Sequence, residues 1–258
     1  MRVLRISETA GAIDLRDALL PHRDARDKGP FDVIPASAFC LTRLRQPAAP
    51  DPVALGCHLM VILSGEVCVE AEQAGLATLG PGDVVCADVR TAGAITYAWE
   101  GDAWLFIVRT PGWLPAPGDN QARHHAAVRT GRPLLTWIRD DSGVSRSEPL
   151  RWPGSLASVP APARWARSNG AFVTRRDYGD GDYAPGKWHN GPRPQLGITL
   201  NGCAENETGD GTITRPVAGD IAFIDDETGA GHITRGQGDR WMLFVTVAPG
   251  HLELTPES

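Results

Sequence analysis

The segment WHNGPRPQLGITLNG (residues 188–202) and the segment VAGDIAFIDDETGAGH (residues 217–232) decide the fold. The first ends in the apolar run LGITLNG, and the second has a glycine–aspartate turn followed by the apolar run IAFI. Short runs of apolar and β-branched residues between glycines and prolines are typical of strands. We therefore expect these segments to contribute neighbouring strands to a β structure.

The same pattern occurs earlier in the chain. A shift of 137 positions aligns residues 58–108 with residues 195–245 without a gap, and 12 of the 51 aligned pairs are identical. Such self-similarity is the signature of a duplicated structural unit. The identical pairs include Gly65 and Gly202, Gly82 and Gly219, Asp83 and Asp220, Asp88 and Asp225, Gly101 and Gly238, Asp102 and Asp239, and Trp104 and Trp241.

Composition favours an ordinary all-β protein that acts on small molecules. Hydrophobic residues make up 42% and charged residues 22% of the chain, and the apolar runs are short, whereas only residues 13–26 have the composition of a helix. The net charge of -6 predicts no broad contact with nucleic acid. No apolar run is long enough to span a membrane, and the first residues lack the apolar core of a signal peptide, so we expect a cytoplasmic protein.

The motifs LSG and LGPGD in the first copy, and LNG and VAGD in the second, resemble those of the cupin superfamily, and the pair of copies resembles a bicupin. The second copy is also similar to small bacterial cupins with a WHNxPRxQ start and a TGxGH end. The resemblance implies an all-β fold of two tandem cupin-like β-barrels of the jelly-roll, or double-stranded β-helix, type.

The duplication and the resemblance together predict the domain organisation. We expect an N-terminal segment (1–30), an N-terminal barrel with a degenerate site (31–112), an inter-barrel segment (113–165), a C-terminal barrel with the candidate site (166–250) and a tail (251–258). Within the inter-barrel segment, PLLTWIRDD predicts an additional strand pair.

The second copy carries the candidate site. Strand alternation places His189, Gly191 and Gln195 on one face. Compared with the cupin pattern, His189 and His232 match the first and last histidine ligands, Gly191 replaces a histidine, and Gln195 replaces the acidic ligand. The resemblance thus implies a weakened site for a divalent transition metal (Fe, Mn, Ni, Co or Zn) at His189, Gln195 and His232. Alternatively, both histidines are buried and hydrogen-bonded in a pocket without metal.

Residues next to these histidines are candidates for substrate binding. Arg193 and Arg235 could hold a carboxylate or phosphate, Trp188 could cover a ligand, and Thr234 shares the parity of His232. The parity of Arg235 also allows it to point outward and pair with the acids at 225–227. We expect Asp225 and Asp226 to form a structural turn, because Asp225 recurs as Asp88 in a copy that lacks the site.

In the first copy, His58 aligns with Gln195, while Pro52 and Ile95 occupy the positions of His189 and His232. A single histidine cannot form the site, and we expect His58 to be a hydrogen-bonded core residue. The five cysteines are odd in number and lack metal-binding spacing, which indicates reduced thiols. A nucleophilic Cys203 has no activating base in the sequence.

Three functions are compatible with these features. The first is a metal-dependent small-molecule enzyme, an oxygenase or Lewis-acid catalyst, with its active site in the C-terminal barrel. The second is a metal-free isomerase or lyase with His189 and His232 as acid and base, and the third is a non-catalytic metabolite-binding bicupin. We expect a homodimer, since the edge strands of paired barrels are often covered by a second chain.

Overall fold

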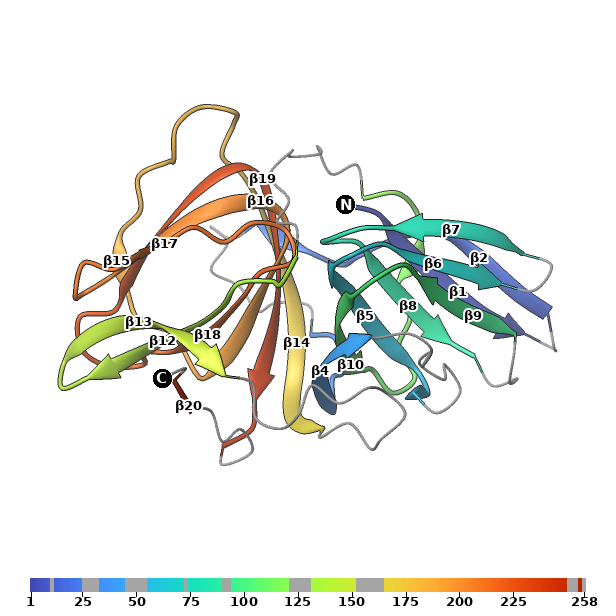
Figure 1. The fold of residues 1–258 in the computed structure, drawn as a ribbon, viewed down its shortest axis with the longest axis horizontal. Helices are drawn as coiled ribbons and strands as arrows, with labels where there is room; N and C mark the ends of the chain where they lie inside the picture. Colours follow the sequence, from blue (N-terminus) through green and yellow to red (C-terminus); the bar gives the residue numbers. More distant parts are fainter. Residues whose placement is uncertain are drawn as a thin grey trace.

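The computed structural model describes residues 1–9, 12–24, 33–44, 55–71, 74–89, 94–120, 131–151, 165–249 and 255–256, and it is an all-β fold, as predicted (Figure 1). No helix in these residues is long and apolar enough to span a membrane. The N-terminal half contains β1 (Val3–Thr9), β2 (Ala12–Leu19), β3 (Arg23–Asp24), β4 (Ala38–Leu44), β5 (His58–Ser64), β6 (Val67–Ala71), β7 (Gly75–Leu79), β8 (Val84–Asp88), β9 (Ile95–Trp99), β10 (Ala103–Arg109) and β11 (Ala116–Pro117). The C-terminal half contains β12 (Leu135–Asp141), β13 (Val144–Arg151), β14 (Ala166–Asp177), β15 (Trp188–His189), β16 (Gln195–Thr208), β17 (Ile213–Thr214), β18 (Ile221–Asp225), β19 (His232–Val247) and β20 (Thr255–Pro256).

The duplication seen in the sequence recurs in the strand pairing. In the N-terminal half His58 of β5 pairs with Ala87 of β8, and in the C-terminal half the equivalent Gln195 of β16 pairs with Ile224 of β18. The pairing of β5 with β10 likewise matches that of β16 with β19, including the irregularity next to the tryptophan of each copy. The two halves therefore share one topology in the same register.

Each half also contains a hairpin formed by the residues that precede its copy of the repeat. Strand β1 pairs in parallel with β8 and forms a hairpin with β2, and β12 pairs in parallel with β18 and forms a hairpin with β13. The strand pair expected from PLLTWIRDD is thus present. Residues 12–19 are strand β2 despite their helical composition, because pairing with β1 satisfies their backbone groups and tertiary pairing outweighs local propensity.

The two halves lie side by side and pack through the duplicated glycine–aspartate turns (Figure 1). A Cβ atom at Gly219 would overlap the carbonyl oxygen of Leu63 in the other half, and a Cβ atom at Gly82 would overlap that of Leu200. Both glycines have positive φ angles, 90° and 86°. Because β4 also pairs with β14, most of the described strands belong to one hydrogen-bonded network, and β7, β6 and β9 form a separate sheet.

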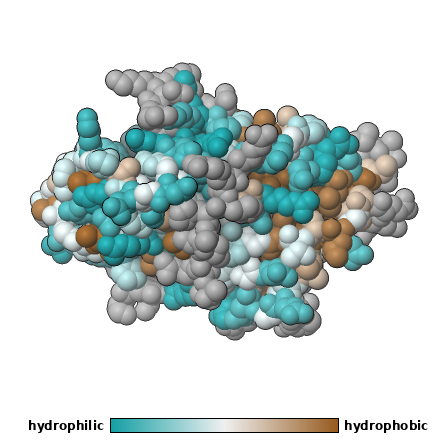
Figure 2. Space-filling view, turned by 90° about the horizontal axis from the view of Figure 1, so that it is seen from above, coloured by the Kyte–Doolittle hydropathy of each residue, from teal (hydrophilic) through white to brown (hydrophobic). Residues whose placement is uncertain are grey.

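Apolar side chains fill the interior of the N-terminal half. Met60, Ile62, Ile95, Leu105 and Ile107 are at most 2% exposed and belong to one hydrophobic cluster. The prediction that Ile95 replaces a site histidine agrees with this packing, while Pro52 lies outside the described residues. Viewed from above, hydrophobic side chains are also visible on the surface of this half (Figure 2).

His58 is a buried, hydrogen-bonded core residue, as predicted. Its Nδ1 atom donates to the carbonyl oxygen of Gly56 at 2.7 Å, and its Nε2 atom lies 3.3 Å from the hydroxyl of Tyr97. Burial lowers the pKa of His58 to about 4. The ring is therefore neutral in the folded protein at neutral pH.

We expect the substitution His58→Gln, which introduces the residue found at this position in the second copy, to reduce the acid sensitivity of the fold. The unfolded chain binds a proton at His58 near pH 6.5, whereas the folded chain binds it only near pH 4. The free energy of unfolding therefore falls as the pH falls from 6.5 to 4, and this group accounts for about 3 kcal/mol of that loss. Urea unfolding of both proteins at pH 7 and pH 4 measures the difference. Equal losses in the two proteins would contradict this account.

Candidate functional site

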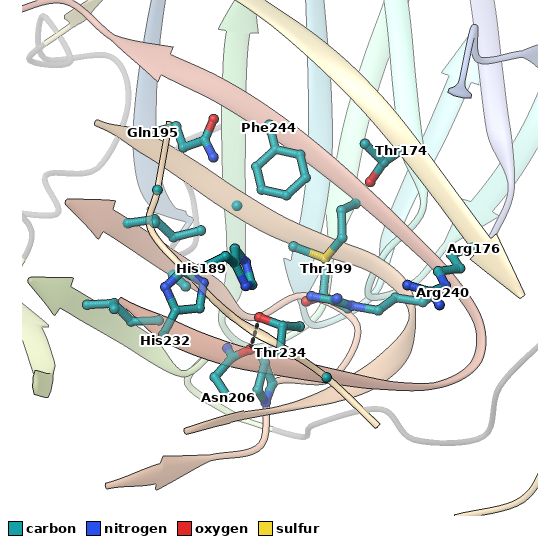
Figure 3. A pocket seen from close by; sticks show the side chains of 18 of the residues that line it. Thr174, Arg176, His189, Gln195, Thr199, Asn206, His232, Thr234, Arg240 and Phe244 are labelled. Carbon is teal, nitrogen blue, oxygen red and sulfur yellow. Dashed lines mark hydrogen bonds between the residues drawn. The ribbon is translucent and has the colours of Figure 1, made fainter. Parts of the chain in front are cut away.

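A cavity of about 550 Å³ occupies the interior of the C-terminal half (Figure 3). Its wall is formed by β14, β16, β18 and β19, by Ile138 of β12 and by residues of the segment that leads into β15. This volume is typical of pockets that enclose a small organic ligand. The described lining includes three basic side chains, Arg176, Lys187 and Arg240, and no carboxylate.

The cavity exists because the second copy has small or polar residues where the first copy has core residues. In the first copy these positions belong to its hydrophobic cluster, and in the second they line the cavity. The equivalent strands thus enclose packed apolar side chains in the N-terminal half and an open pocket in the C-terminal half. The equivalent pairs include Met60 and Gly197, Ile62 and Thr199, Val69 and Asn206, Ile95 and His232, Tyr97 and Thr234, and Ala103 and Arg240.

His189 and His232 face each other at the cavity wall. Their ring centroids are 4.4 Å apart, and the ring planes are inclined at 54°. The rings meet because β15 pairs with β19, with His189 directly opposite His232. Gly231, with a φ of 69°, allows the backbone of His189 to approach closely. The structure therefore brings together the two imidazoles that the sequence suggested.

Asp226 contacts His232, an interaction that was not predicted from the sequence. Its carboxylate is fully buried, and the Oδ2 atom lies 2.7 Å from Nδ1 of His232. The Oδ1 atom accepts a hydrogen bond from the backbone N–H of Gly191 at 3.2 Å. Asp226 therefore contacts a candidate site residue, which the expectation of a structural turn did not include. Its neighbour Asp225 has the opposite strand parity, and only Asp225 recurs in the first copy.

The ring of His189 is oriented by a different contact. Its Nδ1–H donates to the carbonyl oxygen of Lys187 at 2.9 Å, so the lone pair of the neutral ring is on Nε2. Partial burial lowers the pKa of His189 from its ordinary value, and the nearby charge of His232 also lowers it. His189 is therefore neutral at neutral pH.

Two buried polar side chains in the wall have unused hydrogen-bonding atoms. Gln195 is 5% exposed and Thr199 is 1% exposed, and within the described residues neither Oε1 of Gln195 nor Oγ1 of Thr199 has a hydrogen-bond partner. Both residues line the cavity. An unsatisfied buried polar atom costs free energy, so these atoms are suited to bind a ligand or ordered water.

Gln195 lies away from His232 across the cavity (Figure 3). The three residues therefore line the same cavity, but the side chain of Gln195 does not lie next to those of His189 and His232. Within the described residues, no three histidine, cysteine, aspartate or glutamate side chains are placed to hold a metal ion.

Arg176 of β14 and Arg240 of β19 line the part of the cavity opposite the histidines (Figure 3). Neither arginine was predicted from the sequence. The repeat carried a signal for Arg240, because it aligns with the apolar Ala103, whereas Arg176 precedes the repeat and only the strand ladders place it where the N-terminal half has Leu44. Two apolar positions have thus become cationic in the half with the cavity.

The residues proposed from the sequence as substrate contacts have different locations. Thr234 lines the cavity, as its parity suggested, and donates to Oδ1 of Asn206 at 3.0 Å. Arg193 is exposed, Trp188 is 48% exposed, and neither belongs to the cavity wall.

Arg235 points away from the cavity, because strand alternation places it on the opposite face from Thr234. It forms ion pairs with Glu205 and Glu207, rather than with the acids at 225–227 that the sequence suggested.

The five cysteines are free thiols, as predicted. Burial raises the pKa of Cys203 from its ordinary value, and its Sγ atom hydrogen-bonds to Oε1 of Gln237 at 3.2 Å. A raised pKa reduces the thiolate fraction, so Cys203 lacks the character of a nucleophile.

No family model and no curated protein sequence matches this chain. Solved structures similar to it include a cupin 2 conserved barrel domain protein from Leptotrichia buccalis, with 13% identity, 90% of this chain and 100% of that chain covered, and a TM-score of 0.38. A protein of unknown function from Pseudomonas syringae has 14% identity, 95% and 100% coverage, and a TM-score of 0.38. An oxalate decarboxylase mutant from Bacillus subtilis has 11% identity, 87% and 69% coverage, and a TM-score of 0.28. At these identities the likeness concerns the fold alone.

Proposed function

We propose that this cupin-like chain is a small-molecule enzyme whose active site is the cavity of the C-terminal half, with His189 and His232 as a proton-transfer pair. The observation that carries the proposal is the contact between the two rings at the cavity wall, where the ring centroids are 4.4 Å apart. The buried carboxylate of Asp226 hydrogen-bonds to Nδ1 of His232. A carboxylate that accepts a hydrogen bond from Nδ1 of an imidazole fixes the tautomer of the ring and stabilises its protonated form during catalysis.

The two rings differ in environment, which suits them to opposite roles. Neutral His189 presents its Nε2 lone pair and acts as the base. His232 contacts the carboxylate of Asp226 through Nδ1, which leaves Nε2 to act as the acid toward the substrate.

In the reaction, His189 takes a proton from a C–H bond, and the electron pair of that bond remains on the substrate. The pair then either shifts within the substrate or expels a leaving group, and His232 donates its proton to the atom that becomes negative. The reaction is an isomerisation in the first case and an elimination in the second, and neither requires an oxidant.

The donors present do not fit the divalent-metal site that the cupin resemblance implied. A typical facial site has two histidines and a charged carboxylate, whose negative charge helps to hold the ion. Here the carboxylate of Asp226 contacts Nδ1 of His232 and accepts a hydrogen bond from the backbone of Gly191, and Gln195 is a neutral amide. The proposed reaction is therefore assigned to the side chains alone.

Solvent deuterium exchange tests this function. We expect the purified chain, incubated in D₂O with a library of small organic acids and carbonyl compounds, to incorporate deuterium into at least one compound, measured by mass spectrometry. His189→Gln and His232→Gln should each lower the exchange rate on the order of a hundredfold or more, because each removes a proton-transfer group. EDTA treatment should leave the rate unchanged.

His58→Gln is the matched control, because it removes a buried histidine from the half without a cavity and should retain full exchange. Loss of exchange after EDTA treatment would instead support the metal-dependent alternative. Binding of library compounds without exchange of any of them would support the non-catalytic alternative.

A further inference from the structure

Arg176 and Arg240 form a pair of like charges in the cavity wall. They are direct partners in the ladder between β14 and β19. The Cβ atoms of such partners lie about 5 Å apart, and like charges on directly opposite residues destabilise a sheet. A bound anion would offset this repulsion.

The described residues contain no carboxylate that neutralises this pair. Neither arginine makes an ion pair there, although neighbouring arginines such as Arg175 and Arg235 do. Tyr178 contacts both members, since it hydrogen-bonds to Arg240 and its ring lies 4.5 Å from the guanidinium of Arg176. Tyr178 contributes no carboxylate to the pair.

The next positions along the same two strands are apolar or weakly polar. Thr174 pairs with Met242, and Phe172 pairs with Phe244, whose rings are stacked at 5.1 Å. With a rise of about 3.3 Å per residue, the phenylalanine pair lies about 13 Å along the strands from the arginine pair. The wall thus has a cationic end and an apolar end.

We propose that the cavity binds an organic carboxylate, with its anionic group between Arg176 and Arg240 and its apolar body against Met242 and Phe244. The fork of arginine donors matches a carboxylate, and the unpartnered Oγ1 atom of Thr199 and Oε1 atom of Gln195 are available for further polar groups. This inference rests on the proposed function only in that it places the reacting part of the same ligand near His189 and His232.

Binding can be measured without turnover. The probes are acetate, butyrate, octanoate, phenylacetate and 3-phenylpropionate, each compared with its neutral amide and with inorganic phosphate by isothermal titration calorimetry at pH 7. We expect at least one of the larger carboxylates to bind tenfold or more tightly than its amide, and more tightly than acetate or phosphate. Equal binding of acids and amides would overturn the role of the arginines, and phosphate binding as tightly as the best carboxylate would overturn the organic ligand.

Substitutions of the two arginines test whether these residues bind the carboxylate. Arg176→Leu, which introduces the residue at the equivalent ladder position of the N-terminal half, and Arg240→Gln should each weaken carboxylate binding at least tenfold. The melting temperature of unliganded Arg176→Leu should equal or exceed that of the wild type, because the substitution removes a like-charge contact. Arg235→Gln, on the same strand but outside the cavity, is the matched control and should bind as the wild type does.

The two proposals can fail independently. His232→Gln should retain carboxylate binding while losing deuterium exchange. Unchanged carboxylate binding by both Arg176→Leu and Arg240→Gln would refute the arginine site and leave the histidine pair unaffected.

Discussion

Replacing Asp226 by asparagine is expected to lower the deuterium-exchange rate on the order of a thousandfold or more. Asparagine has the same shape but supplies one acceptor and one donor group. If its oxygen continues to accept from the N–H of Gly191, its NH₂ group faces Nδ1 of His232, where the wild type has a carboxylate oxygen. His232 then changes tautomer and cannot form the stabilised imidazolium.

The tautomer can be measured directly by ¹⁵N NMR of the histidine side chains, together with the exchange rate. Asp225→Asn is the control, because this neighbour does not line the cavity and should retain the wild-type rate within a few-fold. A rate for Asp226→Asn within a few-fold of the wild type, with the His232 ring unchanged, would exclude Asp226 from catalysis.

The substitution Gly219→Ala is expected to destabilise the protein by about 3 kcal/mol or more. The new methyl group would overlap the carbonyl oxygen of Leu63 in the other half, and the φ of 90° disfavours any residue with a Cβ atom. Positive φ alone costs about 1 kcal/mol, and overpacking of a rigid contact adds about 1 to 3 kcal/mol. The melting temperature of a chain of this size should therefore fall by about 10 °C.

Gly211→Ala separates the two causes. Gly211 has a similar φ of 82°, but a Cβ atom there would meet no atom within 4 Å. It should therefore show only the backbone cost of about 1 kcal/mol. Gly82→Ala, at the equivalent contact with Leu200, should resemble Gly219→Ala. If Gly219→Ala melts at the same temperature as Gly211→Ala, the glycine–aspartate turns do not hold the halves together.

Much of the fold could be predicted from the repeat. The gapless alignment of the two copies places Gly65 with Gly202 and Trp104 with Trp241, and the observed strand registers follow the same shift. A β register is set by alternation and by turns, both of which are local features of the sequence. Residues 12–19 are the exception, because their strand is stabilised by pairing with β1 rather than by their own composition.

Part of the candidate site was also visible. His189 and His232 were identified because they match motif positions, and Thr234 because it shares a strand face with His232. Asp226 was missed because its partner is six residues away across a turn, and no strand alternation relates them. Arg176 and Arg240 were missed because the ladder that joins them links strands far apart in the chain.

The all-β class, the duplication, the glycine–aspartate turns and the pair of histidines could be read from the amino-acid sequence, because each depends on local spacing or on identity between copies. The filled interior of one half, the cavity of the other, and the two arginines that share this cavity with the histidines became apparent in the three-dimensional structure. Those properties depend on which side chains from distant strands meet in the interior. Equivalent positions of the two copies hold Met60 and Gly197, or Ala103 and Arg240. The volume and charge of a cavity, however, depend on all the side chains that line it.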